Sequence, residues 1–106
     1  MPIHMTAEFR ARPGSVERCV AAIRDFVAAI ARDEPGTRHY VAWQDERDPV
    51  HFLHHFIFAD EAAEQRHRAS DAVRRFTAVL YPETVSGVHF TRYPEVASNH
   101  VSRGPA

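Results

Sequence analysis

The chain has 106 residues, a formal net charge of −1 and a hydrophobic content of 44%. This supports a single domain, and the interspersed acidic and basic residues leave no broad basic face for nucleic acid. The N-terminus has no apolar run before its charged residues, and no stretch approaches the ~20 apolar residues of a membrane span. We therefore expect a cytoplasmic protein with no nucleic acid and no membrane partner.

The first predicted elements are a strand and an amphipathic helix. Residues 3–12 alternate apolar and polar side chains, which is the pattern of a half-buried strand. A Pro-Gly pair ends it, and Ser15 is placed to cap a helix whose apolar stripe continues to about Arg32. Cys19, the only cysteine, lies on that stripe, so we expect it in the core and not in a disulfide.

A hairpin is predicted next. The Glu34-Pro-Gly sequence stops the helix. Strands follow over about 37–45 and 50–58, joined by a polar loop. A short helix capped by Asp60 runs to about Arg68.

The last predicted elements are a helix and a strand. Ser70 or Asp71 begins the helix, which ends at Pro82, and the strand covers about 84–93. Residues 1–93 form the expected domain. The small, polar segment 94–106 is predicted to be a flexible tail or an arm ordered by a partner.

The order β-α-β-β-α-β is that of the ferredoxin-like split βαβ fold, an α+β fold with a four-stranded antiparallel sheet and its helices on one face. The strand 50–58 is apolar or aromatic at nearly every position, so both of its faces should be covered. We predict that a second copy covers the open face, giving a homodimer through the sheet.

One face of the strand 50–58 is the predicted wall of a cavity beneath the helices. Alternation puts four rings on that face, and these are Phe52, His54, Phe56 and Phe58. His67 lies one turn after Ala63 on the helix 60–68, on the same side of the sheet, so we expect both imidazoles in one cavity. A structural role for either histidine stays open, because buried histidines often only bond the backbone.

The neighbouring strand 37–45 contributes a further wall residue. With the loop centred near Arg47, we expect Trp43 and Val41 to join the aromatic face. A slip of one residue would exchange them for Tyr40 and Ala42.

The eight histidines do not predict a metal site. His51 and His55 are four residues apart on one strand, roughly 13 Å, while His54 and His55 point to opposite faces. The motifs HExxH, GxGxxG and GxxxxGKS/T do not occur. We expect neither a metal nor a tightly bound nucleotide cofactor.

The chain resembles the antibiotic biosynthesis monooxygenase family of the dimeric α+β barrel superfamily. The resemblance covers about residues 3–93 and rests on these residues: Ala7, Pro13, Gly14, Glu34, Pro35, Gly36, Tyr40, Asp48, Pro49, Phe52, Asp60, Glu61, Ala62, Ala63, His67 and Ser70.

At several positions of the site this chain departs from the pattern of the family that it resembles. Where the family's middle strand commonly has Glu-x-Trp, this chain has Phe56-Ile-Phe58. An asparagine that serves the anthrone-oxidising members corresponds to His54. The asparagine and tryptophan of the haem-degrading members have no counterpart at Ala7 and Phe58.

The resemblance implies a cofactor-independent monooxygenase that oxidises a small polycyclic or quinol-type aromatic with O2. In this interpretation His54 is the base or oxyanion partner, and His67 orients it or accepts the proton. The walls are Trp43, Phe52, Phe56 and Phe58. The alternative is a non-catalytic dimeric module that binds a small aromatic, and a haem-binding protein is a third, more distant hypothesis.

Overall fold

The computed structural model describes residues 1–100 and has one four-stranded antiparallel sheet in the order β2-β3-β1-β4. The predicted ferredoxin-like α+β fold is confirmed. Its elements in chain order are β1 (Ile3–Ala11), α1 (Val16–Asp33), β2 (Thr37–Gln44), β3 (His51–Phe58), α2 (Glu61–Arg68), α3 (Asp71–Leu80), the short 3-10 helix η1 (Tyr81–Glu83) and β4 (Thr84–Arg92).

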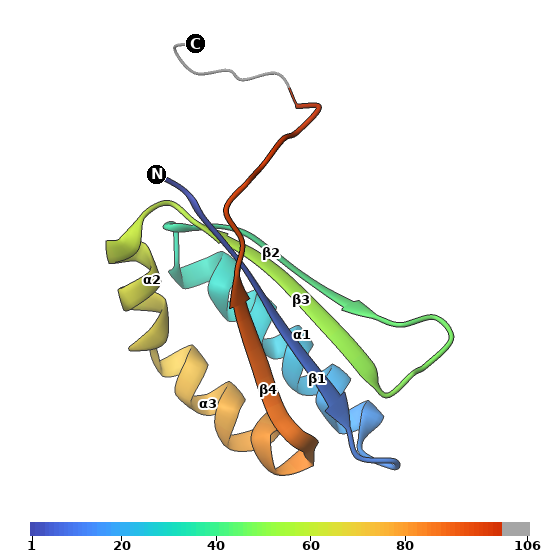
Figure 1. Ribbon diagram of the computed structural model, residues 1–106. Coiled ribbons are helices and arrows are strands. Elements are labelled where there is room, and N and C mark those ends of the chain that lie inside the picture. Colours follow the sequence, from blue (N-terminus) through green and yellow to red (C-terminus); the bar gives the residue numbers. More distant parts are fainter. Residues whose placement is uncertain (101–106) are drawn as a thin grey trace.

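The helices lie on one face of the sheet (Figure 1). The strand β3 alternates strictly between buried and half-buried residues, as the sequence predicted. Its buried side chains face the helices and belong to the core together with apolar residues of β1, α1 and α3. Cys19 is fully buried among them, so its expected place in the core is confirmed. The fold is therefore two layers with one interior between them.

Two of the three predicted helix caps are present. The backbone N–H of Ala63 donates to Asp60 at 2.9 Å and the N–H of Val73 donates to Ser70 at 3.1 Å. Ser15 precedes α1 but its side chain makes no capping bond, which corrects the prediction. Its hydroxyl instead donates to the carboxylate of Glu83 at 2.6 Å, because the turn before β4 lies beside it.

The pairing of β2 with β3 corrects the predicted register. Tyr40 pairs with Phe56 and Ala42 with His54, so Tyr40 and Ala42 share the helix-facing side of the sheet. Trp43 pairs with Leu53 and lies on the outer face. The last pair is Gln44 with Phe52, so the pairing is symmetric about Asp48 and places residues of equal parity on one face.

Beyond β4 the described chain leaves the domain. The N–H of Tyr93 still donates to the carbonyl of His4 at 2.8 Å, and residues 94–100 are exposed. In Figure 1 this segment extends away from the sheet. The prediction of a tail or arm over 94–106 falls partly on residues 101–106, which lie outside the described residues. Within residues 1–100, no helix has the length and apolar character needed to cross a membrane.

Candidate functional site

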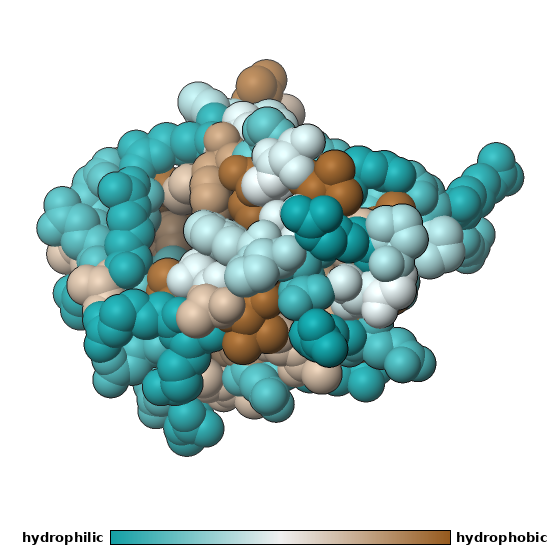
Figure 2. Space-filling model, turned by 90° about the horizontal axis from the view of Figure 1, so that it is seen from below, coloured by the Kyte–Doolittle hydropathy of each residue, from teal (hydrophilic) through white to brown (hydrophobic). Residues whose placement is uncertain are grey.

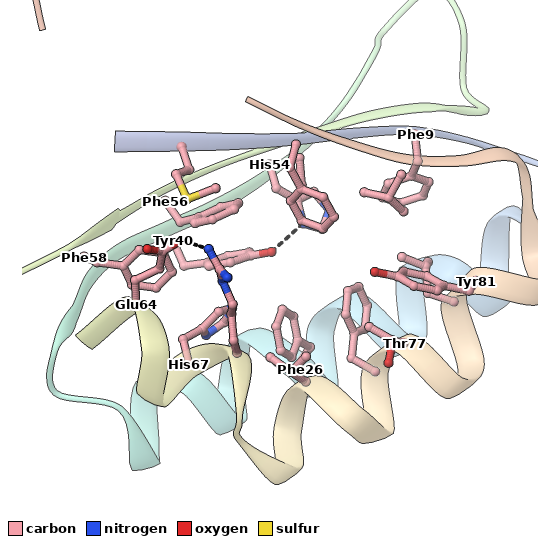
Figure 3. Close-up of a pocket in the computed structure, with 18 residues that line it drawn as sticks. Phe9, Phe26, Tyr40, His54, Phe56, Phe58, Glu64, His67, Thr77 and Tyr81 are labelled. Atoms are coloured by element: carbon pink, nitrogen blue, oxygen red, sulfur yellow. Dashed lines mark hydrogen bonds and ion pairs between the residues drawn. The ribbon is translucent and has the colours of Figure 1, made fainter. Parts of the chain in front are cut away.

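A cavity of about 430 Å³ lies between the helix-facing side of the sheet and the helices. Most of its lining is aromatic or aliphatic, with polar groups at a few positions (Figure 3). Seen from below, the molecule has a hollow with hydrophobic residues inside and hydrophilic residues around it (Figure 2). A partly open, largely apolar cavity with a few polar groups is typical of small-molecule sites.

The space beneath His54 exists because its neighbours on the sheet are small. Its Cα partners are Ala42 on β2 and Ala7 on β1, and Ala7 pairs in turn with Phe90 on β4. A row across the four strands therefore reads Ala42, His54, Ala7 and Phe90. Two methyl groups flank the imidazole, and Ala7 lines the cavity beside it, so a ring at position 7 would occupy part of this space.

The imidazole of His54 is buried and has one hydrogen-bond partner. Its Nδ1 lies 2.7 Å from the hydroxyl of Tyr40, while its Nε2 is buried and has no partner among the described residues. The side chain is 1% exposed, and this burial lowers the pKa of His54 to about 4. The ring is therefore neutral at pH 7.

The hydrogen bond fixes which ring nitrogen carries the proton. Burial raises the pKa of Tyr40, and the negative charge of Glu34 adds to this, so the phenol keeps its proton. Its only hydrogen-bond partner among the described residues is His54, so the arrangement that satisfies the hydroxyl has it donating to Nδ1. We assign the proton of His54 to Nε2, where it is a buried donor without an acceptor.

The second imidazole in the cavity, His67, is held by a carboxylate. Its Nδ1 lies 2.7 Å from Oε1 of Glu34, and both side chains are 11% exposed. The hydroxyl of Thr37 also donates to Oε1 of Glu34, at 2.8 Å. A carboxylate accepts a hydrogen bond, so Nδ1 of His67 carries a proton, and in the neutral form of the ring Nε2 is then the acceptor.

The remaining polar groups lie at the edge of the cavity. Glu64 is buried on α2 and accepts hydrogen bonds from Arg68 at 2.7 Å and Arg92 at 2.9 Å. Phe90 and Tyr81 line the cavity but are 57% and 47% exposed. The cavity thus opens between β4 and the end of α3, where large apolar side chains meet solvent.

The structure brings four of the six predicted site residues together. His54, His67, Phe56 and Phe58 all line the cavity. Phe52 faces the helices but packs in the core cluster with Phe9 and Cys19, so it is not a cavity wall.

Trp43 was predicted as a wall and this location is wrong. It is 50% exposed on the outer face of the sheet, where its ring stacks on His55 at 6.3 Å. The one-residue shift in pairing described above is the cause.

Sequence reasoning missed three side chains of the site, Phe26, Phe76 and Glu34, and gave Tyr40 only as the result of a slip in register. Tyr40 takes the place assigned to Trp43, and its ring stacks on Phe56 at 5.0 Å. Phe26 and Phe76 stack at 4.1 Å and form the wall opposite the sheet. Their spacing on amphipathic helices predicts only that they are buried in the core, not that they line a cavity. Glu34 was interpreted as a helix stop, although an acidic residue at that position carries a charge that a turn does not require.

The outer face of the sheet holds further histidines. The rings of His4 and His39 lie 6.0 Å and 5.1 Å from that of His55. Within the described part of the chain, no group of three histidine, cysteine or acidic side chains is arranged to hold a metal ion.

The fold and cavity define a ferredoxin-like α+β protein with a largely apolar cavity between sheet and helices. The model of the antibiotic biosynthesis monooxygenase family matches residues 2–79, and the chain belongs to this family. A comparison with curated proteins gave no match.

Solved structures share the fold along nearly the whole chain. Rv0793 from Mycobacterium tuberculosis has a TM-score of 0.84 at 19% identity, covering 94% of this chain and 100% of that chain. A Caulobacter crescentus protein has a TM-score of 0.84 at 17% identity, with 91% of each chain covered. PA3566 from Pseudomonas aeruginosa has a TM-score of 0.80 at 27% identity, covering 91% of this chain and 95% of that chain.

Proposed function

We propose that the protein is a cofactor-independent monooxygenase that oxidises a small polycyclic or quinol-type aromatic with O2. Membership in the antibiotic biosynthesis monooxygenase family supports the reaction class. The observation that carries the proposal is Nε2 of His54, a buried polar atom without a partner among the described residues, on a side chain that lines an aromatic cavity. A buried donor without an acceptor costs about 1–3 kcal/mol, which a bound oxygen atom recovers.

In this proposal the cavity orients a planar substrate. The rings of Tyr40 and Phe56 on the sheet and of Phe26 and Phe76 on the helices form two facing apolar walls. Offset stacking on such walls stabilises an aromatic ligand. The N–H of His54 donates to the carbonyl or phenolate oxygen of the substrate, so His54 serves as the oxyanion partner. Its low pKa argues against the role of base, because a group that ionises at about pH 4 removes a phenolic proton poorly.

The proton acceptor in the proposal is His67, since its Nε2 is the free acceptor in the cavity. The substrate loses a proton to Nε2 and becomes an electron-rich anion. The anion transfers one electron to O2, and the resulting radical and superoxide combine to a peroxide. Protonation of the peroxide and cleavage of its O–O bond release water and leave one oxygen atom in the product as a carbonyl. The apolar walls keep other water from the intermediate.

Oxygen uptake with a panel of anthrones and hydroquinones tests this proposal. Uptake must exceed the spontaneous rate, and mass spectrometry of the product must show one oxygen gained and two hydrogens lost. His54→Gln, which keeps a donor but displaces it, is expected to lower the rate. Absence of uptake with every compound of the panel contradicts the proposed reaction.

The alternative is a non-catalytic module that binds a small aromatic. Phe56 and Phe58 favour it, because both are buried hydrocarbon walls at positions where the resemblance implies a carboxylate and an indole. Binding of a fluorescent polycyclic phenol without oxygen uptake supports this alternative. A Soret band on addition of hemin would support haem binding instead.

We further propose that the protein is a homodimer through the outer face of the sheet. That face carries apolar and aromatic side chains on β2 and β3, including Trp43 and Leu53, and no element of the described chain covers it. Two such faces pressed together about a twofold axis would bury them. Light scattering during size-exclusion chromatography gives the mass, and a monomer at micromolar concentration contradicts the dimer.

A further inference from the structure

His67 borders two cavities of opposite character. One is the aromatic cavity, and the other, of about 360 Å³, lies on the far side of the ring between the end of α1 and the helices α2 and α3. Within residues 1–100, His67 is the one residue that lines both. The second cavity is polar, and its charged members are Arg32, Asp33, Glu34, Arg66, Asp71 and Arg75.

The carboxylate of Glu34 belongs to the polar cavity and contacts the histidine from that side. Its Oε1 accepts hydrogen bonds from His67 and Thr37. Its Oε2 is buried and has no partner among the described residues. A buried carboxylate with one unbonded oxygen destabilises the fold unless an opposite charge offsets the lost hydration. A positive charge on the adjacent imidazole would supply this offset.

The chain holds this pair in place by a close contact next to it. Glu34 follows the last residue of α1, and two residues later Gly36 lies against α2. A Cβ on Gly36 would lie only 2.7 Å from Cβ of Ala63. The glycine therefore lets the start of β2 approach α2, which carries His67 one turn beyond Ala63.

We propose that Glu34 and His67 form an acid-base dyad in which Glu34 is the positioning residue. The inference rests on the proposed function, since it names the group that makes His67 a base. When a phenolic ligand binds, its O–H bond breaks and the proton forms an N–H bond at Nε2 of His67. The resulting imidazolium keeps its Nδ1 proton in the hydrogen bond to Glu34, whose charge stabilises it.

The other charged groups around His67 leave Glu34 as the charge in direct contact. On the cavity side Tyr40 and His54 are neutral. Most ionic groups of the two cavities occur in pairs, and these pairs are Arg32 with Asp33, Arg68 with Glu64, and Arg74 with Asp71. Two further arginines, Arg66 and Arg75, line the polar cavity.

The tautomer of His67 tests the dyad without any ligand. Two-dimensional ¹⁵N–¹H spectra of the imidazoles are expected to show His67 with its proton on Nδ1 in the wild type. In Glu34→Gln the amide can donate or accept, so the Nε2–H form becomes populated. A wild-type His67 with its proton on Nε2 would overturn the proposal.

Ionisation of a bound phenol tests the consequence of the dyad. The probe is 4-nitro-1-naphthol, a bicyclic phenol whose anion absorbs in the visible and which does not consume oxygen. Bound to the wild type, it is expected to ionise at a lower pH than in water. Glu34→Gln should raise the apparent pKa of the bound probe by about one unit, which is a tenfold change in ionisation.

Two matched variants test whether the ionisation of the probe depends on the position of the Glu34 carboxylate, and not on the total charge of the cavity or on misfolding. Asp33→Asn removes one negative charge from the adjacent residue, which lines the polar cavity without contacting His67, and should leave the ionisation unchanged. Glu34→Asp keeps the charge but withdraws it by one methylene, and should show a partial shift. Equal ionisation in wild type and Glu34→Gln, with both folded by circular dichroism, contradicts the dyad. These readouts do not depend on oxygen uptake, so the dyad can fail or stand independently of the reaction.

Discussion

The hydroxyl of Tyr40 lies 2.7 Å from Nδ1 of His54, and this bond leaves the other ring nitrogen buried without a partner among the described residues. The pair joins β2 to β3 within the helix-facing side of the sheet. Burial keeps His54 neutral at pH 7, and in the proposed function the same ring donates to the ligand.

Folding should therefore become less favourable in mild acid. An unfolded histidine ionises near pH 6.5, and in the folded state burial lowers the pKa of His54 to about 4. Between these values the unfolded chain binds a proton that the folded one does not. The stabilisation is complete above pH 6.5 and is lost as the pH falls towards 4, by about 3 kcal/mol in total.

Urea unfolding of the wild type and His54→Phe between pH 4 and 7.5 measures this contribution. The variant should be less stable at pH 7, because Tyr40 loses its acceptor, but its stability should fall less steeply with acid. Parallel profiles for the two proteins would contradict the assignment of the pH dependence to His54.

Gly36→Ala should destabilise the fold. The added methyl group would lie 2.7 Å from Cβ of Ala63, and relieving this overlap requires the start of β2 and α2 to separate, at about 1–3 kcal/mol. The double variant Gly36→Ala with Ala63→Gly removes the opposing methyl group and should recover part of the loss, although Ala63→Gly alone costs about 1 kcal/mol in helix propensity. Thermal unfolding of the four proteins checks this, and additive losses would show that the two residues do not clash.

Filling the cavity from α3 should prevent ligand binding while the protein stays folded. Thr77 lines the cavity, whereas Val79 on the same helix does not and is 44% exposed. Thr77→Phe should weaken binding of 4-nitro-1-naphthol at least tenfold, or about 1.4 kcal/mol. Val79→Phe adds a ring outside the cavity and should leave the affinity unchanged. Fluorescence titration gives both values, and equal affinities would place the ligand elsewhere.

Trp43→Ala should weaken the proposed dimer without weakening ligand binding in the cavity. The indole lies on the outer face, so ligand affinity should stay within a factor of two. In the proposed dimer, removal of a large ring from the interface should increase dissociation at least tenfold, in line with the energetic weight of tryptophan at interfaces. Sedimentation at several concentrations measures this, and loss of ligand binding would contradict the position of the indole.

The sequence predicted the elements well because their signals are local. The alternation of β3, the stripe of α1 and the caps at Asp60 and Ser70 each depend on residues a few positions apart. They correctly predicted that His54, Phe56 and Phe58 face the helices.

The rest of the site depends on pairing between strands and on gaps between side chains, which local patterns do not encode. Shifting the β2 pairing by one residue puts Tyr40 in place of Trp43 on the helix-facing side of the sheet. Tyr40 is also the hydrogen-bond partner of His54. Similarly, the contact between Glu34 and His67 spans 33 positions, and it lies beside the close approach of Gly36 to Ala63, which no local pattern encodes. The cytoplasmic location and the roles of the site residues stay predictions.

The alanines on either side of His54 also bear on how this chain could diverge. Ala7 and Ala42 are the smallest members of the row that crosses the sheet, and neither methyl group takes part in a hydrogen bond. Ala7 lines the cavity, so a larger aliphatic residue at this position would make the cavity smaller and leave the imidazole bonded to Tyr40. A single substitution could thus change the size of the ligand that fits the cavity, without changing the histidines to which the proposed function assigns proton transfer and hydrogen bonding.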